Sequence, residues 1–504
     1  MPASDRIDPE FQALPLQRLA KTALNRAVDF NAAHADFRLE RLRNQDVHLR
    51  DGALVDASVS TDLGFGVRVV VDDTWGFAAG VALTVDEVNR VTEQAVRMAM
   101  VAKDMSTEAI ELADEPVYSD AGWSSAYDVD PFQVSTQDKV ALLRDWSEPL
   151  RNAPVVDHVS AHVHQVAENK FYADSHGTTT IQQRIRLHPE VEVHGVDRRR
   201  GIFDSMRTIA PPVGRGWEYL SGDGYDWQAE LAALPDHLAG KLAAPSVEAG
   251  VYDLVIDPSN LWLTIHESIG HATELDRALG YEANFAGTSF ATPDKLGTLR
   301  YGSPCMHVTG DRTIEHGLAT IGYDDDGVET QRWDLIKDGL LVGYQTDRRM
   351  AQLMGWGRSN GCAFADSPSH MPIQRMANVS LQPAADDTST ADLISRVERG
   401  ILVVGDNSWS IDMQRYNFQF TAQRFFEIRD GDIRGHLRDA AYQATTTDFW
   451  GSMEAVGGPA TWRLHGAFNC GKAQPGQVAP VSHGCPAALF RGVRILNTTS
   501  EAGH

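Results

Sequence analysis

The chain has 504 residues, and its 45 lysines and arginines against 69 aspartates and glutamates give a formal net charge of −24. This length is typical of two or three domains, and 42% hydrophobic with 23% charged residues is typical of a folded protein rather than a disordered one. A surface with so much excess negative charge repels nucleic acid and anionic lipid. We therefore expect neither a nucleic-acid nor a membrane partner.

The N-terminal residues and the cysteines indicate a cytoplasmic protein. No basic region leads into an apolar run at the N-terminus, so no signal peptide is expected, and no stretch approaches the ~20 apolar residues that span a bilayer. The four cysteines, at positions 305, 362, 470 and 485, are too few for a disulfide framework. We expect reduced thiols that pack or bind metal.

The first hundred residues predict a compact module of helices and strands. Apolar residues at helical spacing over 15–34 predict one helix. Residues 47–50 and 54–59 alternate on either side of Asp51-Gly52, which is typical of a hairpin, and 67–71 predict a third strand. A second helix is expected to begin at Thr84, because Glu87 follows at capping-box spacing.

The middle of the chain alternates again and predicts a strand-rich region over 155–200, followed by a helix near 226–242. His162 and His164 both fall on the polar side of this alternation, so a solvated strand face is favoured over a metal site. The fold class is therefore α+β. We expect an N-terminal α/β module over 1–110, a strand-rich middle domain over 111–245 and a large β-rich domain over 246–504.

One motif carries chemistry, the run from His266 to His271 that reads HESIGH. Two histidines with a glutamate after the first are typical of zinc peptidases, in which the histidines bind the metal and the glutamate takes a proton from water. The usual spacing is i, i+4, whereas these histidines lie at i, i+5, about 140° apart on a straight helix. They can share one ion only if the helix is bulged, and Gly270 is the residue that most readily permits a π-bulge.

A catalytic zinc also needs a third protein ligand and one open position for water. Spacing alone does not choose among several residues. The candidates are Glu274, Asp276, Cys470, His483 and Cys485.

The motif region resembles the TldD/PmbA family of metalloproteases. The resemblance is carried by HESIGHATELDR at 266–277 and by Asn469-Cys470-Gly471-Lys472 with Gln474-Pro475-Gly476-Gln477. Further segments follow in family order: FAGTSF at 285–290, DDDGVE at 324–329, DLIKDGLLVGY at 334–344, SNG at 359–361, PIQRMAN at 372–378 and WSID at 409–412. With the N-terminal module included, the resemblance covers nearly the whole chain.

The resemblance implies a zinc peptidase with a bulged HExxxH helix. It implies that His266, His271 and Cys470 bind Zn²⁺ and that Glu267 is the general base. It also implies the active, TldD-type branch, since PmbA-type partners lack these ligands. The expected substrates are short or unfolded peptides, and the expected partner is a PmbA-type subunit or, failing that, a second copy. The alternative is a non-catalytic subunit that binds peptides or acts as a scaffold.

Several other residues are candidates for a role in the reaction or in metal binding. His316, Arg375 and His465 are candidates for contacts with the transition state or a peptide terminus. Asp324-Asp325-Asp326-Gly327 resembles part of a calcium loop but lacks its full ligand series, so a turn is favoured. For Cys485, a packed thiol is favoured over a second metal site with His483.

Overall fold

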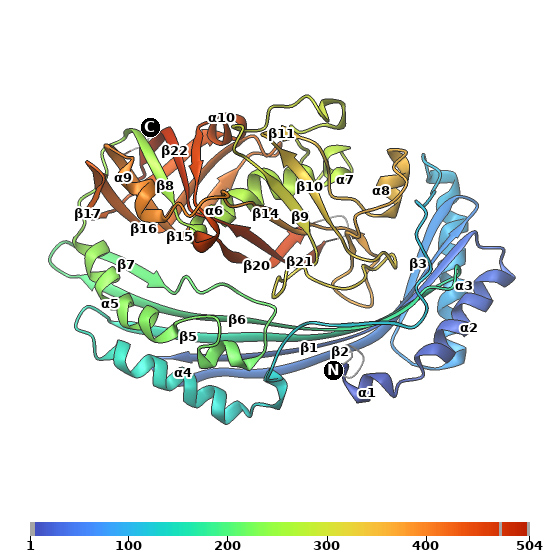
Figure 1. Ribbon diagram of the computed structural model, residues 1–504. Helices are drawn as coiled ribbons and strands as arrows, with labels where there is room; N and C mark the ends of the chain where they lie inside the picture. The colour runs from blue at the N-terminus through green and yellow to red at the C-terminus, as the bar shows by residue number, and fades with distance from the viewer. Residues whose placement is uncertain (1–5, 473–475, 501–504) are drawn as a thin grey trace.

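The computed structural model describes residues 6–472 and 476–500 and has two parts, a long curved sheet and a β-rich body in its hollow (Figure 1). The mixed α+β class is as expected. Gln474 and Pro475 of the family-like segment lie outside the described residues. No helix in the described ranges combines the length and apolar character needed to cross a bilayer.

The curved sheet has the strand order β3-β2-β1-β5-β6-β4, with β7 paired to β6. Its strands are β1 His34–Arg50, β2 Ala53–Val71, β3 Thr74–Gly80, β4 Ala121–Ser124, β5 His158–Asp174, β6 Thr179–Asp197 and β7 Ile202–Arg207. The accompanying helices are α1 Pro9–Gln12, α2 Leu16–Asp29, α3 Val85–Ala102, α4 Thr136–Arg151 and α5 Trp227–Ala243. The predicted helices and the hairpin are confirmed, and Asp51 and Gly52 both have positive φ.

One strand prediction is wrong. Residues 54–59 and 67–71 belong to the same 19-residue strand, β2, rather than to two strands. The polar residues between them, including Ser60 and Thr61, continue the pairing with β1, opposite Asn44 and Arg43. They are exposed, so their polar character reflects solvent contact and not a loop.

Strand alternation gives the curved sheet two different faces. Apolar odd-numbered residues such as Phe37, Val47 and Val163 pack under the helices in two clusters, one with α2 and α3 and one with α4 and α5. Charged even-numbered residues such as Arg38 and Lys170 face the β-rich body. Strands from both sides of residue 110 share this sheet, while the division into three domains stays a prediction.

The β-rich body begins after α5, and its main sheet runs β15-β8-β22-β18-β16-β17, with an added β15–β16 pairing that closes the sheet on itself. Its strands are β8 Gly250–Ile256, β9 Val308–Asp311, β10 Arg332–Lys337, β11 Leu340–Leu341, β12 Ala363–Phe364, β13 Ile373–Gln374, β14 Asn378–Leu381, β15 Arg399–Ile411, β16 Asn417–Arg429, β17 Asp432–Leu437, β18 Ala440–Thr445, β19 Met453–Val456, β20 Arg463–Lys472, β21 Gln477–Cys485 and β22 Ala488–Asn497. Its helices are α6 Pro258–Ile265, α7 Leu275–Ala278, α8 Arg348–Leu353, α9 Thr390–Ser395 and α10 Thr446–Gly451.

Helix α6 carries the histidine motif into the centre of this body. Asp257 caps it by accepting the backbone N–H of Ser259 at 2.9 Å, and Pro258 occupies its first turn. All eight of its residues are buried. A helix that is buried all round sits in a core, so the histidine motif at its C-terminal end is held rigidly by packing.

Candidate metal centre

The five residues after α6, His266–Gly270, form a single π-helical turn. The backbone N–H of His271 bonds to the carbonyl of His266, five residues back. The predicted bulge is therefore confirmed. The extra residue rotates His271 onto the side of His266, and the two ring centroids lie 4.7 Å apart.

His266, His271 and Cys470 place one ligand atom each within 4.8 Å of one another, and all three side chains are buried. Over residues 6–472 and 476–500 this is the one group of three or more such side chains with that spacing. The Cys470 Sγ lies 3.5 Å from His271 Nε2. Tetrahedral zinc with bonds of ~2.05 Å to nitrogen and ~2.3 Å to sulfur would separate two such atoms by about 3.6 Å. The spacing fits a metal ion.

Hydrogen bonds leave each imidazole with one nitrogen free for metal. His483 Nδ1 lies 2.8 Å from the Val379 carbonyl and can only donate to it. The Nε2 of a neutral His483 is then an acceptor, and His266 Nδ1 lies 2.8 Å away and donates to it. His266 therefore keeps the lone pair of its Nε2.

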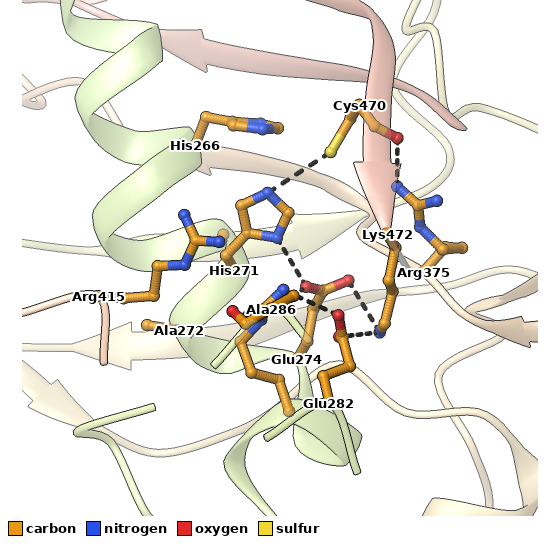
Figure 2. A network of polar contacts seen from close by, with 12 residues as sticks. His266, His271, Ala272, Glu274, Glu282, Ala286, Arg375, Arg415, Cys470 and Lys472 are labelled. Carbon is orange, nitrogen blue, oxygen red and sulfur yellow. Dashed lines mark hydrogen bonds and ion pairs between the residues drawn. The ribbon is translucent and has the colours of Figure 1, made fainter. Parts of the chain in front are cut away.

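The second imidazole is oriented in the same way by a carboxylate (Figure 2). His271 Nδ1 lies 2.8 Å from Glu274 Oε2, which leaves Nε2 toward Cys470. Burial lowers the pKa of both His266 and His271, which favours the neutral ring that a metal requires. The donor set, two neutral imidazoles and a cysteine that binds as its thiolate, is one that binds zinc.

A buried ion-pair cluster supports Glu274. The Lys472 ammonium lies 3.3 Å from Glu274, 2.8 Å from Asp276 and 3.4 Å from Glu282. Burial alone would raise the pKa of Glu274, but Lys472 and His271 hold it well below its ordinary value. The carboxylate is thus an anchored acceptor for His271.

The other candidate ligands have different roles in the structure. Glu274 lies on the Nδ1 side of His271, away from Cys470, and Asp276 pairs with Lys472. The Cys485 thiol lies 3.6 Å from the Pro258 carbonyl and is fully buried, as a packed thiol was expected to be. His483 contacts His266 directly, a position that sequence spacing across 217 residues does not reveal.

Glu267 and a residue that sequence reasoning missed complete the site. Glu267 Oε2 accepts a hydrogen bond from Arg415 Nη1, and their side chains are 6% and 15% exposed. Arg375, weighed for the transition state, donates instead to the carbonyls of Cys470 at 2.6 Å and Gln477 at 3.1 Å. Arg375 thus fixes the strand that carries Cys470.

The two histidines of the middle region and the acidic segment lie outside the centre. His162 and His164 both contact Asp46, at 3.1 and 2.8 Å, on a partly exposed strand face. The 324–327 segment is a turn, in which Asp324 accepts the backbone N–H groups of Asp326 and Val328.

Comparison with known proteins supports the same chemistry. Residues 249–497 match the model of the PmbA/TldA metallopeptidase C-terminal domain, and residues 35–99 match PmbA/TldA metallopeptidase domain 1. The chain is 27% identical to a metalloprotease of Methanocaldococcus jannaschii, over 90% of this chain and 94% of that protein. It is 22% identical to a protein of Saccharolobus solfataricus named zinc metalloprotease TldD homolog, over 94% of this chain and 98% of that protein.

A solved structure shares the fold. TldE from Thermococcus kodakarensis matches with a TM-score of 0.69 and 18% sequence identity, over 95% of this chain and 99% of that chain.

Proposed function

Because this chain belongs to the PmbA/TldD family of metallopeptidases, we propose that it is a zinc-dependent peptidase that cleaves short or unfolded peptides. The observation that carries the proposal is the set of three converging ligand atoms, two of them fixed by hydrogen bonds to His483 and Glu274. Zinc suits the two-imidazole, one-thiolate set, and it is the metal in the name of the Saccharolobus relative. His266, His271 and Cys470 would hold it.

When bound, the metal lowers the pKa of a coordinated water and polarises the peptide carbonyl. The chain supplies the proton acceptor: Glu267 follows His266 directly and takes the proton of the attacking water. Glu267 later gives that proton to the leaving amine, so it acts as base and then as acid. The buried position of Glu267 and the three ligands favours an extended peptide over a folded protein as substrate.

A non-catalytic subunit that binds peptides or acts as a scaffold is the alternative. Such a subunit needs neither the ligand triplet nor the buried supports of its histidines. A buried Lys472 with three carboxylates is costly to maintain unless it serves the site, so the geometry favours the enzyme.

The deciding experiment compares wild type with Glu267→Gln. We expect about one zinc per chain in both proteins, and a loss of peptide cleavage of ~10²-fold or more in the variant, since only the proton acceptor is removed. Glu315→Gln, at a glutamate whose side chain is 75% exposed, is the matched control and should keep full activity. Full activity in Glu267→Gln, or no bound metal in wild type, would refute the proposal.

The proposed partner is a PmbA-type subunit or a second copy, and the hairpin of β1 and β2 offers a place for it. Strand β3 pairs only with residues 65–71 of β2, so the edge of residues 53–64 is free of any strand among the described residues. Leu54, Val55 and Val59 on it are 49%, 60% and 63% exposed. An exposed apolar strand edge is a template for pairing with a strand of another chain.

The double variant Val55→Lys/Val59→Lys tests this edge. In light scattering it should convert the assembly to monomers, and an unchanged mass would exclude the edge as the interface.

A further inference from the structure

Arg415 lies in the turn between β15 and β16 and reaches the proposed base from a distant part of the chain. Its Nη1 donates to Glu267, 148 residues earlier in sequence. Figure 2 shows its guanidinium beside the imidazole of His271, on the side away from Cys470. A cation therefore contacts Glu267, and its charge acts on the imidazole of His271.

The turn is built to hold Arg415 in one place. Its φ is 62°, a left-handed conformation that a residue with a side chain adopts only when its surroundings impose it. Asp412 imposes it by accepting the backbone N–H groups of Gln414 at 3.1 Å, Tyr416 at 2.8 Å and Asn417 at 3.0 Å. The hydroxyl of Thr446 donates to the Arg415 carbonyl at 2.8 Å.

The guanidinium has donors to spare. It carries five N–H bonds, and Glu267 accepts from Nη1 alone. The Nε of Arg415 is buried and has no hydrogen-bond partner among the residues that the structure describes. A buried donor without a partner is costly, and it marks a place where an additional acceptor is favoured.

Arg375, Lys472 and His316 each contact other groups. Arg375 donates to two backbone carbonyls, and Lys472 pairs with three carboxylates and the Gln374 carbonyl. His316 lies beside the Gly214 carbonyl at 3.3 Å, in the contact with the curved sheet. Within the described residues, Arg415 is the cation that contacts the base.

We propose that Arg415 is a catalytic residue that stabilises the oxyanion of the tetrahedral intermediate. The inference rests on the proposed function of Glu267. When the water oxygen bonds to the carbonyl carbon, the C=O π pair moves to the carbonyl oxygen and a water proton moves to Glu267. One negative charge thus passes from Glu267 to the substrate oxygen, and the net charge is unchanged.

Arg415 interacts with that negative charge before and after it moves. In the resting site the positive charge of Arg415 balances the Glu267 carboxylate. Once Glu267 is protonated, the pairing with it weakens, and the same guanidinium donates its free N–H groups to the oxyanion. A donor that gains strength only as charge develops lowers the barrier without tightening substrate binding.

The test measures zinc-loaded Arg415→Gln and Arg415→Lys against wild type, with two readouts. In peptide hydrolysis we expect kcat to fall 10²–10³-fold in Arg415→Gln with KM within about 3-fold, as for the loss of an oxyanion donor. In calorimetry we expect a phosphinic pseudopeptide, which mimics the tetrahedral intermediate, to lose affinity by a similar factor. The uncleaved peptide, measured in the Glu267→Gln background, should lose little. Arg415→Lys should be intermediate.

Equal losses for pseudopeptide and peptide, or unchanged kcat at full zinc content, would overturn the proposal. If Arg415→Gln does not fold, Arg415→Lys tests the proposal. Lysine offers a single ammonium in place of the guanidinium, so a wild-type kcat in Arg415→Lys would also overturn the proposal. Failure of the zinc peptidase proposal looks different, since wild type itself would then cleave no peptide or hold no zinc.

Discussion

At the scale of single residues, the proposed centre depends on which ring nitrogen of each histidine carries a proton. His483 sets this for His266, and Glu274 sets it for His271. Both supports are neutral or anionic acceptors, so both histidines present Nε2 inward. The Val379 carbonyl fixes the proton of His483 on Nδ1, and His483 in turn fixes the proton of His266 on its Nδ1.

Replacing His483 with leucine should weaken zinc binding. Without its acceptor, the Nδ1–H of His266 is left unpaired in the core, and the loss of such a support costs 10–100-fold in metal affinity. Competition with a chromogenic chelator measures this. His465→Leu removes another buried imidazole from the opposite strand and is the matched control. Equal affinities in His483→Leu and wild type would show that His483 does not orient His266.

At the scale of elements, the π-helical turn is what makes an i, i+5 pair into one site. Sequence reasoning predicts this turn, because the spacing and the nearby glycine restrict the geometry locally. His483 and Arg415 could not be placed from sequence, because each reaches the site through strand pairing and turns far along the chain. For the three acidic residues at 324–326 the sequence predicts a turn, but it does not predict their ion pairs with the curved sheet.

Gly270→Ala should distort the turn. A Cβ at this position would lie 2.5 Å from the Met376 sulfur, and Met376 is buried. Overpacking of this kind costs about 1–3 kcal/mol of stability and should shift His271. We expect weaker zinc binding, with part of the affinity restored in Gly270→Ala/Met376→Ala, where the space is returned. A double variant no better than Gly270→Ala alone would contradict this explanation.

At the scale of the whole molecule, charged residues join the curved sheet to the β-rich body. Lys170 contacts Asp325 at 2.8 Å, and Arg68 contacts Asp326 at 2.7 Å. The alternation that buries apolar residues under the helices is readable in sequence. The sequence does not reveal that the opposite, charged face is also buried, because charged residues at alternating strand positions usually face solvent.

Glu40 makes this contact sensitive to pH. It is fully buried, and neither of its carboxylate oxygens has a hydrogen-bond partner in the described part of the chain. Arg38 and Lys170 lie 3.5 and 3.6 Å away. Burial raises the pKa of Glu40 from 4.5 to about 8, assisted by Glu168 and Asp325 and opposed by Lys170 and Arg38. The folded protein therefore holds a proton that the unfolded chain has lost above pH 4.5.

This stabilisation is complete below about pH 4.5 and is lost as pH rises through about 8, at up to ~1.4 kcal/mol per pH unit. Glu40→Gln should remove that slope, so its gain in stability over wild type should grow from pH 5 to pH 8. Glu168, whose pKa is lowered, changes stability only at lower pH. Urea unfolding at several pH values measures the difference, with exposed Glu10→Gln as control. A constant difference across this range would contradict the assignment.

The central claim, that His266, His271 and Cys470 hold one zinc ion, is tested most directly by X-ray absorption at the zinc edge of the purified protein. We predict a first shell with two imidazole nitrogens at ~2.0–2.1 Å, one sulfur at ~2.3 Å and one further light ligand. The sulfur scattering should disappear in Cys470→Ser. A shell without sulfur in wild type, or a spectrum that Cys470→Ser leaves unchanged, would contradict the claim.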